Sequence, residues 1–326
     1  MMYCLAPMEG ITGYIYRNAY NACFRPMDQY VTPFIAPKHK SGLSTREVND
    51  ILPEHNRGMR VVPQILTNRA DDFLKTAETL REYGYKEVNL NLGCPSGTVV
   101  SKGKGSGFLA KKEELDCFLE EISQGLLKLH MKLSIKTRIG KTEEEEFEEL
   151  LDIYNKYPLS EIIIHPRVQT DYYKNTPRLR AFGLAMEKSV SPVCYNGDLF
   201  RTEDVRTLKE SWPELERLML GRGVLANPFL VEMIEGPSRT DPHSAIRRLE
   251  DFHQLIYEGY RQVMSGDRNV LFKMKELWVY LSQSFLGAEP YMKRIRKAQR
   301  LSEYEAAVAG MLRNLEFDEM GGFQGF

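Results

Sequence analysis

Residues 132–154, KLSIKTRIGKTEEEEFEELLDIY, place a short β-branched and apolar run directly before an amphipathic helical pattern. One set of apolar residues has the i, i+3, i+4, i+7 spacing of a buried helix face: Phe147, Leu150, Leu151 and Tyr154. Thr142 and Glu145 have the spacing of a capping box at the start of this helix. The acidic run is therefore predicted to be a solvated helix face, and the stretch to be one strand–helix unit.

The same alternation continues in both directions along the chain. Eight strands are predicted, with starts about 30 residues apart, the size of one strand–helix–strand step: residues 3–8, 29–36, 60–66, 87–92, 132–137, 161–165, 192–195 and 217–220. Eight such units predict an α/β protein with a (β/α)₈ barrel, which typically takes about 250 residues.

After residue 236 the alternation stops. Four amphipathic stretches are predicted to be helices: residues 244–264, 269–286, 290–300 and 303–315. We therefore predict a barrel domain over residues 1–237 and a smaller all-α domain over residues 238–326, joined by the short linker PSRTDP at 237–242.

The composition limits the classes of function. In 326 residues, 44 lysines and arginines face 45 acidic residues, so overall charge does not attract nucleic acid, although a local basic patch can. No apolar run approaches the about 18 residues of a membrane span, and no secretion signal is evident, so a cytoplasmic protein is expected. The five cysteines form no CxxC pair, which argues against disulfides and a structural metal site.

Barrel enzymes build their active sites at the carboxyl ends of the strands. In this sequence nearly every predicted strand ends in or near polar or glycine residues, which are the candidate site residues: Pro7, Met8 and Glu9; Gln64; Asn91 and Cys94; Lys136 and Arg138; His165 and Arg167; Asn196, Gly197 and Asp198; Gly221 and Arg222. The glycine-bearing turns after the last two strands are typical of the barrel's phosphate site, to which Arg222 can add a bidentate contact.

Lys136 lies within an apolar run, where a charge is costly unless an anion meets it. From the sequence three interpretations remain open. The lysine can form a Schiff base, as in aldolase-type barrels, it can lie beside a cofactor, or it can belong to a structural ion pair.

Cys94 follows a strand and precedes Pro95 and a glycine-rich segment over residues 96–107, which we expect to move as a lid. With an ordinary pKa of about 8.5 a thiol is mostly protonated at neutral pH, which suits a proton donor. As a nucleophile it would need a base, and His165 is the candidate.

Seven strings from Ala6 to Phe229 resemble the tRNA-dihydrouridine synthases, which are FMN-dependent barrel enzymes that reduce a uridine in tRNA. The strings are APMEGIT, VNLNLGCPS, GKGSGFL, IKTRIG, IHPR, YNGD and GRGVLANPF. The third residue of the motif after the sixth strand departs from the family, which more often has glycine where Pro166 stands. This departure leaves the modified uridine position open.

The resemblance implies roles for the candidate residues. The residues that would bind FMN are Pro7, Met8, Glu9, Gln64, Lys136, His165, Asn196, Gly197, Asp198, Gly221 and Arg222. Asn91, Arg138 and Arg167 would bind the target uracil, and Cys94 would protonate C5 while C6 receives a hydride from flavin N5. NADPH would be the reductant, and because no dinucleotide fingerprint is present, this nicotinamide nucleotide would use the same cleft as the RNA.

A helical face in the C-terminal domain offers the expected tRNA contact. Four cations have i, i+3, i+4, i+7 spacing: Lys293, Arg296, Lys297 and Arg300. Two other functions stay open. A flavoenzyme for free pyrimidines, like a dihydroorotate dehydrogenase, would not need this face, and a non-enzymatic RNA-binding barrel would not need a flavin.

Overall fold

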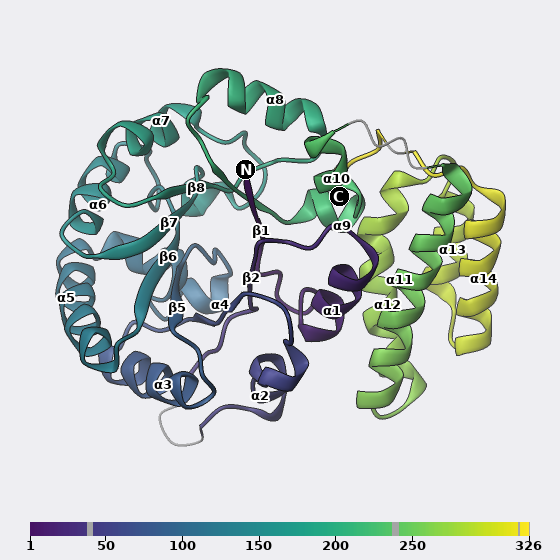
Figure 1. Ribbon diagram of the computed structural model, residues 1–326, viewed down its shortest axis with the longest axis horizontal. Helices are drawn as coiled ribbons and strands as arrows, with labels where there is room; N and C mark the ends of the chain where they lie inside the picture. The colour runs from purple at the N-terminus through teal and green to yellow at the C-terminus, as the bar shows by residue number, and fades with distance from the viewer. Residues whose placement is uncertain (38–41, 237–240, 319, 326) are drawn as a thin grey trace. The chain divides into compact units, whose positions relative to one another are not determined.

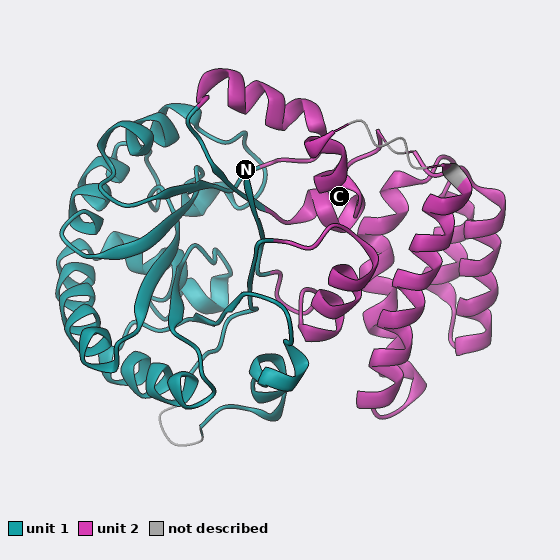
Figure 2. Cartoon of the chain, viewed as in Figure 1, with its two compact units in different colours: residues 1–7, 28–197, 214–219 teal, residues 8–27, 198–213, 220–326 magenta. Residues whose placement is uncertain are grey.

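The structure is a computed structural model that describes residues 1–37, 42–236, 241–318 and 320–325. The chain divides into two compact units, shown in different colours in Figure 2. The first comprises Met1–Pro7, Asp28–Gly197 and Glu214–Met219, and the second Met8–Met27, Asp198–Pro213 and Leu220–Phe326. The predicted domain boundary at 237/238 and most of the predicted linker lie outside the described residues, and that boundary stays a prediction.

Nine strands form one sheet, in which every pair with an assigned register is parallel. Their order is β3-β2-β1-β9-β8-β7-β6-β5-β4, and their bounds are β1 (Met2–Leu5), β2 (Gln29–Val31), β3 (Val61–Val62), β4 (Gln64–Ile65), β5 (Glu87–Leu92), β6 (Lys132–Arg138), β7 (Leu159–His165), β8 (Val193–Tyr195) and β9 (Arg217–Leu220). Figure 1 shows these strands surrounded by helices.

Pro63 accounts for nine strands where eight were predicted. It separates β3 from β4 because proline has no N–H to donate to the sheet. β3 pairs with β2, β4 pairs with β5, and Ile35 bridges to Ile65, so the two short strands are one interrupted strand that closes the ring. The predicted (β/α)₈ barrel is confirmed.

The helices of the first unit follow the strands in the expected alternation. They are α2 (Thr45–Ile51), α3 (Ala70–Glu82), α4 (Gly97–Val100), α5 (Lys112–Leu129), α6 (Glu146–Tyr154) and α7 (Leu179–Lys188), with the 3₁₀ turns η1 (Pro53–His55), η2 (Gly105–Ala110) and η3 (Gln169–Asp171). The predicted capping box of α6 is wrong. The helix begins one residue beyond Glu145, and the Glu146 carboxylate accepts hydrogen bonds from the N–H groups of residues 141–143 instead.

The second unit contains the four predicted C-terminal helices together with helices from earlier in the chain. The C-terminal helices are α11 (Pro242–Val263), α12 (Asp267–Leu281), α13 (Glu289–Lys297) and α14 (Leu301–Asn314), with η4 (Ser282–Ser284) between α12 and α13. The others are α1 (Tyr14–Cys23), α8 (Thr202–Ser211), α9 (Arg222–Ala226) and α10 (Leu230–Glu235). No helix within the described ranges is both long and apolar enough to cross a membrane.

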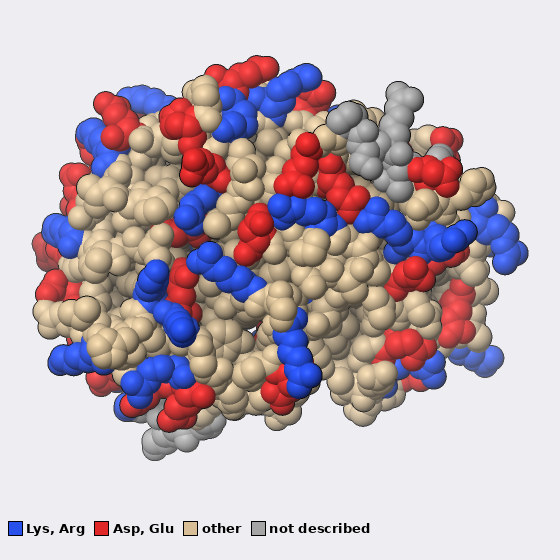
Figure 3. All heavy atoms as spheres, viewed as in Figure 1, with Lys and Arg blue, Asp and Glu red and all other residues tan. Residues whose placement is uncertain are grey.

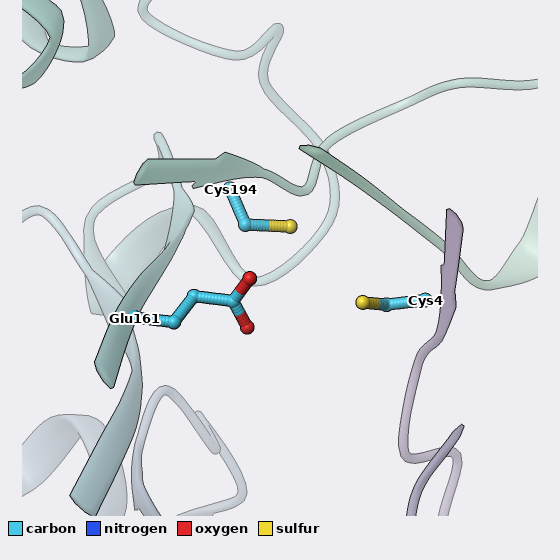
Figure 4. A group of neighbouring side chains, drawn as sticks. All are labelled: Cys4, Glu161 and Cys194. Atoms are coloured by element: carbon cyan, nitrogen blue, oxygen red, sulfur yellow. The ribbon is translucent and has the colours of Figure 1, made fainter. Parts of the chain in front are cut away.

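Inside the barrel, Cys4, Glu161 and Cys194 point toward one another from β1, β7 and β8 (Figure 4). All three are buried, and their ligand-type atoms lie within 4.8 Å of one another. Burial raises the pKa of Glu161, but Arg217 donates a hydrogen bond of 3.0 Å to its carboxylate and opposes that rise. Because Arg217 already neutralises Glu161 and burial raises the pKa of the Cys194 thiol, we interpret the group as a polar layer of the core.

Candidate active site

A chain of amide side chains connects β4, β5 and β6 at the carboxyl side of the barrel. Gln64 donates to Asn89 at 2.8 Å and accepts from Asn91 at 2.7 Å, and Asn89 donates to Ser134 at 3.0 Å. Asn89 and Asn91 share one face of β5 because side chains alternate along a strand. All four residues are buried, so the hydrogen bonds fix the orientation of Asn91.

Asn91 in turn fixes the turn that carries Cys94. Its side-chain oxygen accepts hydrogen bonds from the N–H groups of Gly93 at 3.1 Å and Cys94 at 2.9 Å. On the other side, the carbonyl oxygen of Cys94 accepts from the N–H and the hydroxyl of Ser106 at 3.1 and 2.8 Å. The thiol residue is therefore held from two directions.

The segment after Cys94, which was expected to move as a lid, is folded in the structure, and its mobility stays a prediction. It forms α4 and η2, and residues 105–109 are buried. Gly105 has φ +55°, and a Cβ there would lie 2.7 Å from the carbonyl oxygen of Cys94. The glycines therefore allow close packing of this segment against Cys94, which is a different use from mobility.

Lys136 lies beside Asn91 in the sheet register, near the carboxyl end of β6. No carboxylate among the described residues lies within ion-pair distance of it, so the predicted alternative of a structural ion pair is wrong. Burial and the charge of Arg138 lower the pKa of Lys136 to about 8. The residue is only partly exposed and its ammonium group has no counter-ion among the described residues, which is the environment expected of a group that meets an anionic ligand.

Arg138 is almost fully buried and serves as a clamp. Its guanidinium donates to the carbonyl oxygens of Gly93 at 3.1 Å, Val168 at 2.7 Å and Tyr172 at 2.5 Å. It therefore joins the turn before Cys94 to the loop after β7. This contact set supports a positioning role for Arg138 more directly than the predicted substrate contact.

His165 and Arg167 form a second pair at the end of β7. Arg167 donates to Nε2 of His165 at 2.9 Å and to the carbonyl oxygen of Asn175 at 2.5 Å. Since Nε2 accepts this bond, we assign the ring proton to Nδ1. The nitrogen bound by Arg167 is then not available as the base for Cys94.

Tyr173 was missed by the sequence reasoning. Its ring lies 6.1 Å from that of His165, the Arg138 guanidinium lies 5.3 Å from its centroid, and the side chain is 50% exposed. It follows Tyr172, which has φ +51°, an uncommon conformation for a bulky residue. The available signal was the Tyr-Tyr pair in a polar loop shortly after a strand that ends in histidine.

The end of β8 is fixed by Asn196, which donates to the carbonyl oxygen of Met219 in β9 at 2.8 Å. Gly197 follows it, where a Cβ would lie 3.2 Å from the hydroxyl of Tyr195. Pro7, the last residue of the first unit's opening segment, is half-buried.

In the second unit, the loops after β8 and β9 meet through Asp198 and Arg222. Their side chains form an ion pair of 2.6 Å. The Arg222 guanidinium also lies over the rings of Phe200 and Phe323, two residues that the sequence reasoning missed. Gly221 precedes α9, and at Gly223 a Cβ would lie only 2.1 Å from the Leu199 carbonyl oxygen, so the two loops are packed closely.

The same unit contains the turn with Met8 and Glu9. Met8 is half-buried, and its N–H donates to the Thr12 hydroxyl at 2.8 Å, whereas the Glu9 side chain is exposed. The strand predicted to continue to Met8 ends at Leu5 because the chain turns here, with the N–H groups of Ile11 and Thr12 bonded to the Met8 carbonyl oxygen.

Cations gather on α13, in an arrangement that differs from the predicted one. Lys293, Arg296 and Lys297 are exposed on the helix, but the helix ends at Lys297, so Arg300 lies beyond it and precedes α14. Arg294, which was not predicted, joins Lys293 and Lys297 around a shallow hollow of about 590 Å³. Figure 3 shows blue and red side chains mixed over the visible face, so a basic region on that face is local.

The fold is that of a barrel enzyme, and the candidate active site lies at the carboxyl ends of the strands, where cationic and amide groups lie near Cys94. The description "Dihydrouridine synthase (Dus)" belongs to the protein family whose model matches residues 4–316. The chain therefore belongs to the dihydrouridine synthase family and is an oxidoreductase.

Two similar curated proteins carry consistent names. A probable tRNA-dihydrouridine synthase of Staphylococcus aureus is 27% identical over 314 residues, which cover 94% of this chain and 92% of the relative. The probable tRNA-dihydrouridine synthase 2 of Bacillus subtilis is 26% identical over 242 residues, covering 71% of each chain. Among solved structures, morphinone reductase in complex with tetrahydroNAD is 12% identical, with a TM-score of 0.48 over 74% of this chain and 89% of the other.

Proposed function

We propose that the protein reduces the C5=C6 bond of a uridine in tRNA to dihydrouridine, with FMN as its cofactor and NADPH as the reductant. Membership of the dihydrouridine synthase family supports the reaction. The names of the two curated relatives support tRNA as the substrate. A tRNA substrate would place this activity in the cytoplasm.

Lys136 is the observation that carries the cofactor proposal. A buried ammonium group with no carboxylate partner among the described residues suits an anionic group bound in the barrel mouth. When bound, reduced flavin has negative charge near N1 and O2 and supplies the hydride that C6 of the uracil receives. Lys136 favours that negative charge, and Gln64, which is hydrogen-bonded to the neighbouring Asn91, can donate or accept a hydrogen bond at the polar edge of the ring.

Cys94 supplies the proton for C5 of the uracil. Its backbone is bound through Asn91 and Ser106, so the main chain that carries the thiol keeps one position while the base enters. Arg138 maintains this position through Gly93. Asn91 and Arg167 orient the uracil ring, and general acids of this kind contribute about 10²- to 10⁴-fold to rate.

The other residues that we propose to bind FMN come from both units of the chain. In the first unit they are Pro7, His165, Asn196 and Gly197, and in the second Met8, Glu9, Asp198, Gly221 and Arg222. The turns after β8 and β9 are where barrel enzymes hold phosphate groups. The target uridine must leave its stack at a cost of a few kcal/mol, and phosphate contacts on α13, with Arg300, would offset part of that cost.

The test is a visible spectrum of the purified protein, followed by incubation with NADPH and unmodified tRNA and measurement of dihydrouridine. We expect a flavin spectrum and dihydrouridine in tRNA only. Parallel incubations with free uracil and dihydroorotate test the free-pyrimidine alternative. Turnover of a free pyrimidine without turnover of tRNA, or a protein that binds tRNA but no flavin, would overturn the proposal.

A further inference from the structure

The C-terminal segment 320–325 contacts the loop after β8 and the arginine that follows β9. The ring of Phe323 lies 5.1 Å from that of Phe200, and the Arg222 guanidinium lies 4.9 Å from the first centroid and 5.1 Å from the second. The three groups therefore form a triangle with sides of about 5 Å. Phe323 is only 6% exposed.

The path of this segment is fixed by its own contacts. The N–H of Gln324 donates to Gln283 at 2.7 Å, and Asn227 donates to the carbonyl oxygen of Gly321 at 3.2 Å. Gly322 passes so close that a Cβ there would lie 2.5 Å from the Phe200 carbonyl oxygen. Phe323 is thus placed against Arg222 by neighbours on both sides.

The Arg222 side chain is oriented by two kinds of contact. Asp198 binds one of its N–H groups at 2.6 Å, and the rings of Phe200 and Phe323 contact the guanidinium by cation–π interaction. A guanidinium has five N–H donors in a fixed plane, and an arginine side chain loses rotamer entropy when it is immobilised. Contacts that immobilise it beforehand remove this cost from the binding of a ligand.

We propose that Phe323, carried by the C-terminal segment, is a positioning residue that orients Arg222 toward the phosphate of FMN, so that the protein distinguishes FMN from riboflavin. This inference rests on the proposed function. The Asp198–Arg222 pair has no net charge, so the orientation of the guanidinium group decides how well the pair binds a phosphate. Riboflavin has the same ring system and lacks the phosphate. Its affinity therefore measures the contacts of the ring and ribityl chain without the phosphate contact.

The test measures dissociation constants for FMN and riboflavin, by quenching of flavin fluorescence, with the full-length protein freed of bound flavin. Phe323→Ala should weaken FMN binding about 5- to 10-fold and leave riboflavin binding within about 2-fold of the wild type. Phe323→Leu, which keeps apolar volume without an aromatic face, should show the same selective loss in smaller degree. Arg222→Met should remove the preference for FMN, and adding Phe323→Ala to it should change little more.

Phe272→Ala is the matched control, because Phe272 lies on α12 in the same unit and is 68% exposed. Equal weakening for both flavins by Phe323→Leu, or no change for either, would overturn the inference and leave the proposed function intact. A wild-type protein that binds FMN and riboflavin equally well would do the same. A wild-type protein that binds neither flavin would overturn both proposals.

Discussion

Cys94 owes its position to Asn91, whose single side-chain oxygen binds two consecutive N–H groups of the turn. Nucleophilic thiols are usually activated by a neighbouring base, but Nε2 of the candidate base, His165, is bound by Arg167. The residues around Cys94 therefore support a proton donor.

Replacing Cys94 by alanine should reduce dihydrouridine formation by about 10²- to 10⁴-fold while flavin binding is kept. The measurements are dihydrouridine per tRNA and the flavin absorbance of the purified variant. Cys117→Ala is the control, because Cys117 is exposed on α5. Normal turnover of the Cys94 variant would exclude it as the proton donor.

Replacing Lys136 by methionine should make the reduction potential of the bound flavin more negative, because the positive charge that favours the reduced anion is lost. The fold should tolerate the change, since no carboxylate within the described part of the chain loses a partner. Equilibration with redox dyes measures the potential. Lys132→Met, at the exposed start of the same strand, is the control, and equal potentials in both variants would contradict the placement of Lys136.

At the scale of single elements, α13 concentrates exposed positive charge on a short helix. Met292 and Ile295 face the core of the second unit, and the cations Lys293, Arg294 and Lys297 surround the hollow on the exposed side. A surface of this kind binds phosphates through charge, so its contribution depends on salt.

Alanine at Lys293, Arg294 and Lys297 together should raise KM for tRNA and leave kcat nearly unchanged. The dependence of log KM on log salt should become shallower by about 2 to 3 units, since three phosphate contacts are removed. Alanine at the exposed Lys86, Lys128 and Lys132 makes the same change in net charge and should leave KM as it is. Equal effects of the two triple variants would mean that α13 has no particular role.

The strand and helix pattern was readable from the sequence because burial periodicity is local, and the barrel follows from it. The first and last residues of several elements could not be predicted in this way, because they depend on contacts with neighbouring segments. The end of α13 at Lys297 and the turn after Leu5 are set by backbone hydrogen bonds that no periodicity reveals. Glu146 displaced Glu145 as the capping residue because a longer reach back to three N–H groups satisfies more donors.

At the scale of the whole molecule, site residues at strand ends were predictable because parallel strands present their carboxyl ends together. Tyr173, Phe200 and Phe323 were missed for the opposite reason, since their contacts join segments that are distant in the sequence or lie in loops without a pattern. Phe323 meets Arg222 across about a hundred residues of chain.

The free energy of unfolding should depend on pH through His253, which is buried among aromatic rings of α11, α12 and α14. Its Nε2 lies 2.6 Å from the Tyr304 hydroxyl, which also accepts from Trp278 at 2.8 Å. Burial lowers the pKa of His253 to about 4, whereas an unfolded histidine has a pKa of about 6.5. The unfolded state therefore takes up the proton first as pH falls.

The free energy of unfolding should accordingly decrease by up to about 3 kcal/mol between pH 6.5 and pH 4, from this residue alone, and change little through it above pH 6.5. Urea titrations at several pH values measure this. His253→Gln keeps an acceptor for Tyr304 without a titrating ring and should flatten the profile, whereas His243→Gln on the same helix should not. Identical profiles for both variants would contradict the assignment.

The hydrogen bonds that Asn91 and Ser106 make with the backbone of Cys94 have a consequence for the nucleic acid. Because its N–H and its carbonyl oxygen are both bound, the backbone of Cys94 cannot move toward a substrate, so the nucleotide must approach the proposed proton donor. Transfer RNAs whose loops open readily would then be processed faster than those already stiffened by folding or by other modifications. Because this turn of the enzyme is fixed, the rate of reduction should depend on how easily the loop of the tRNA opens.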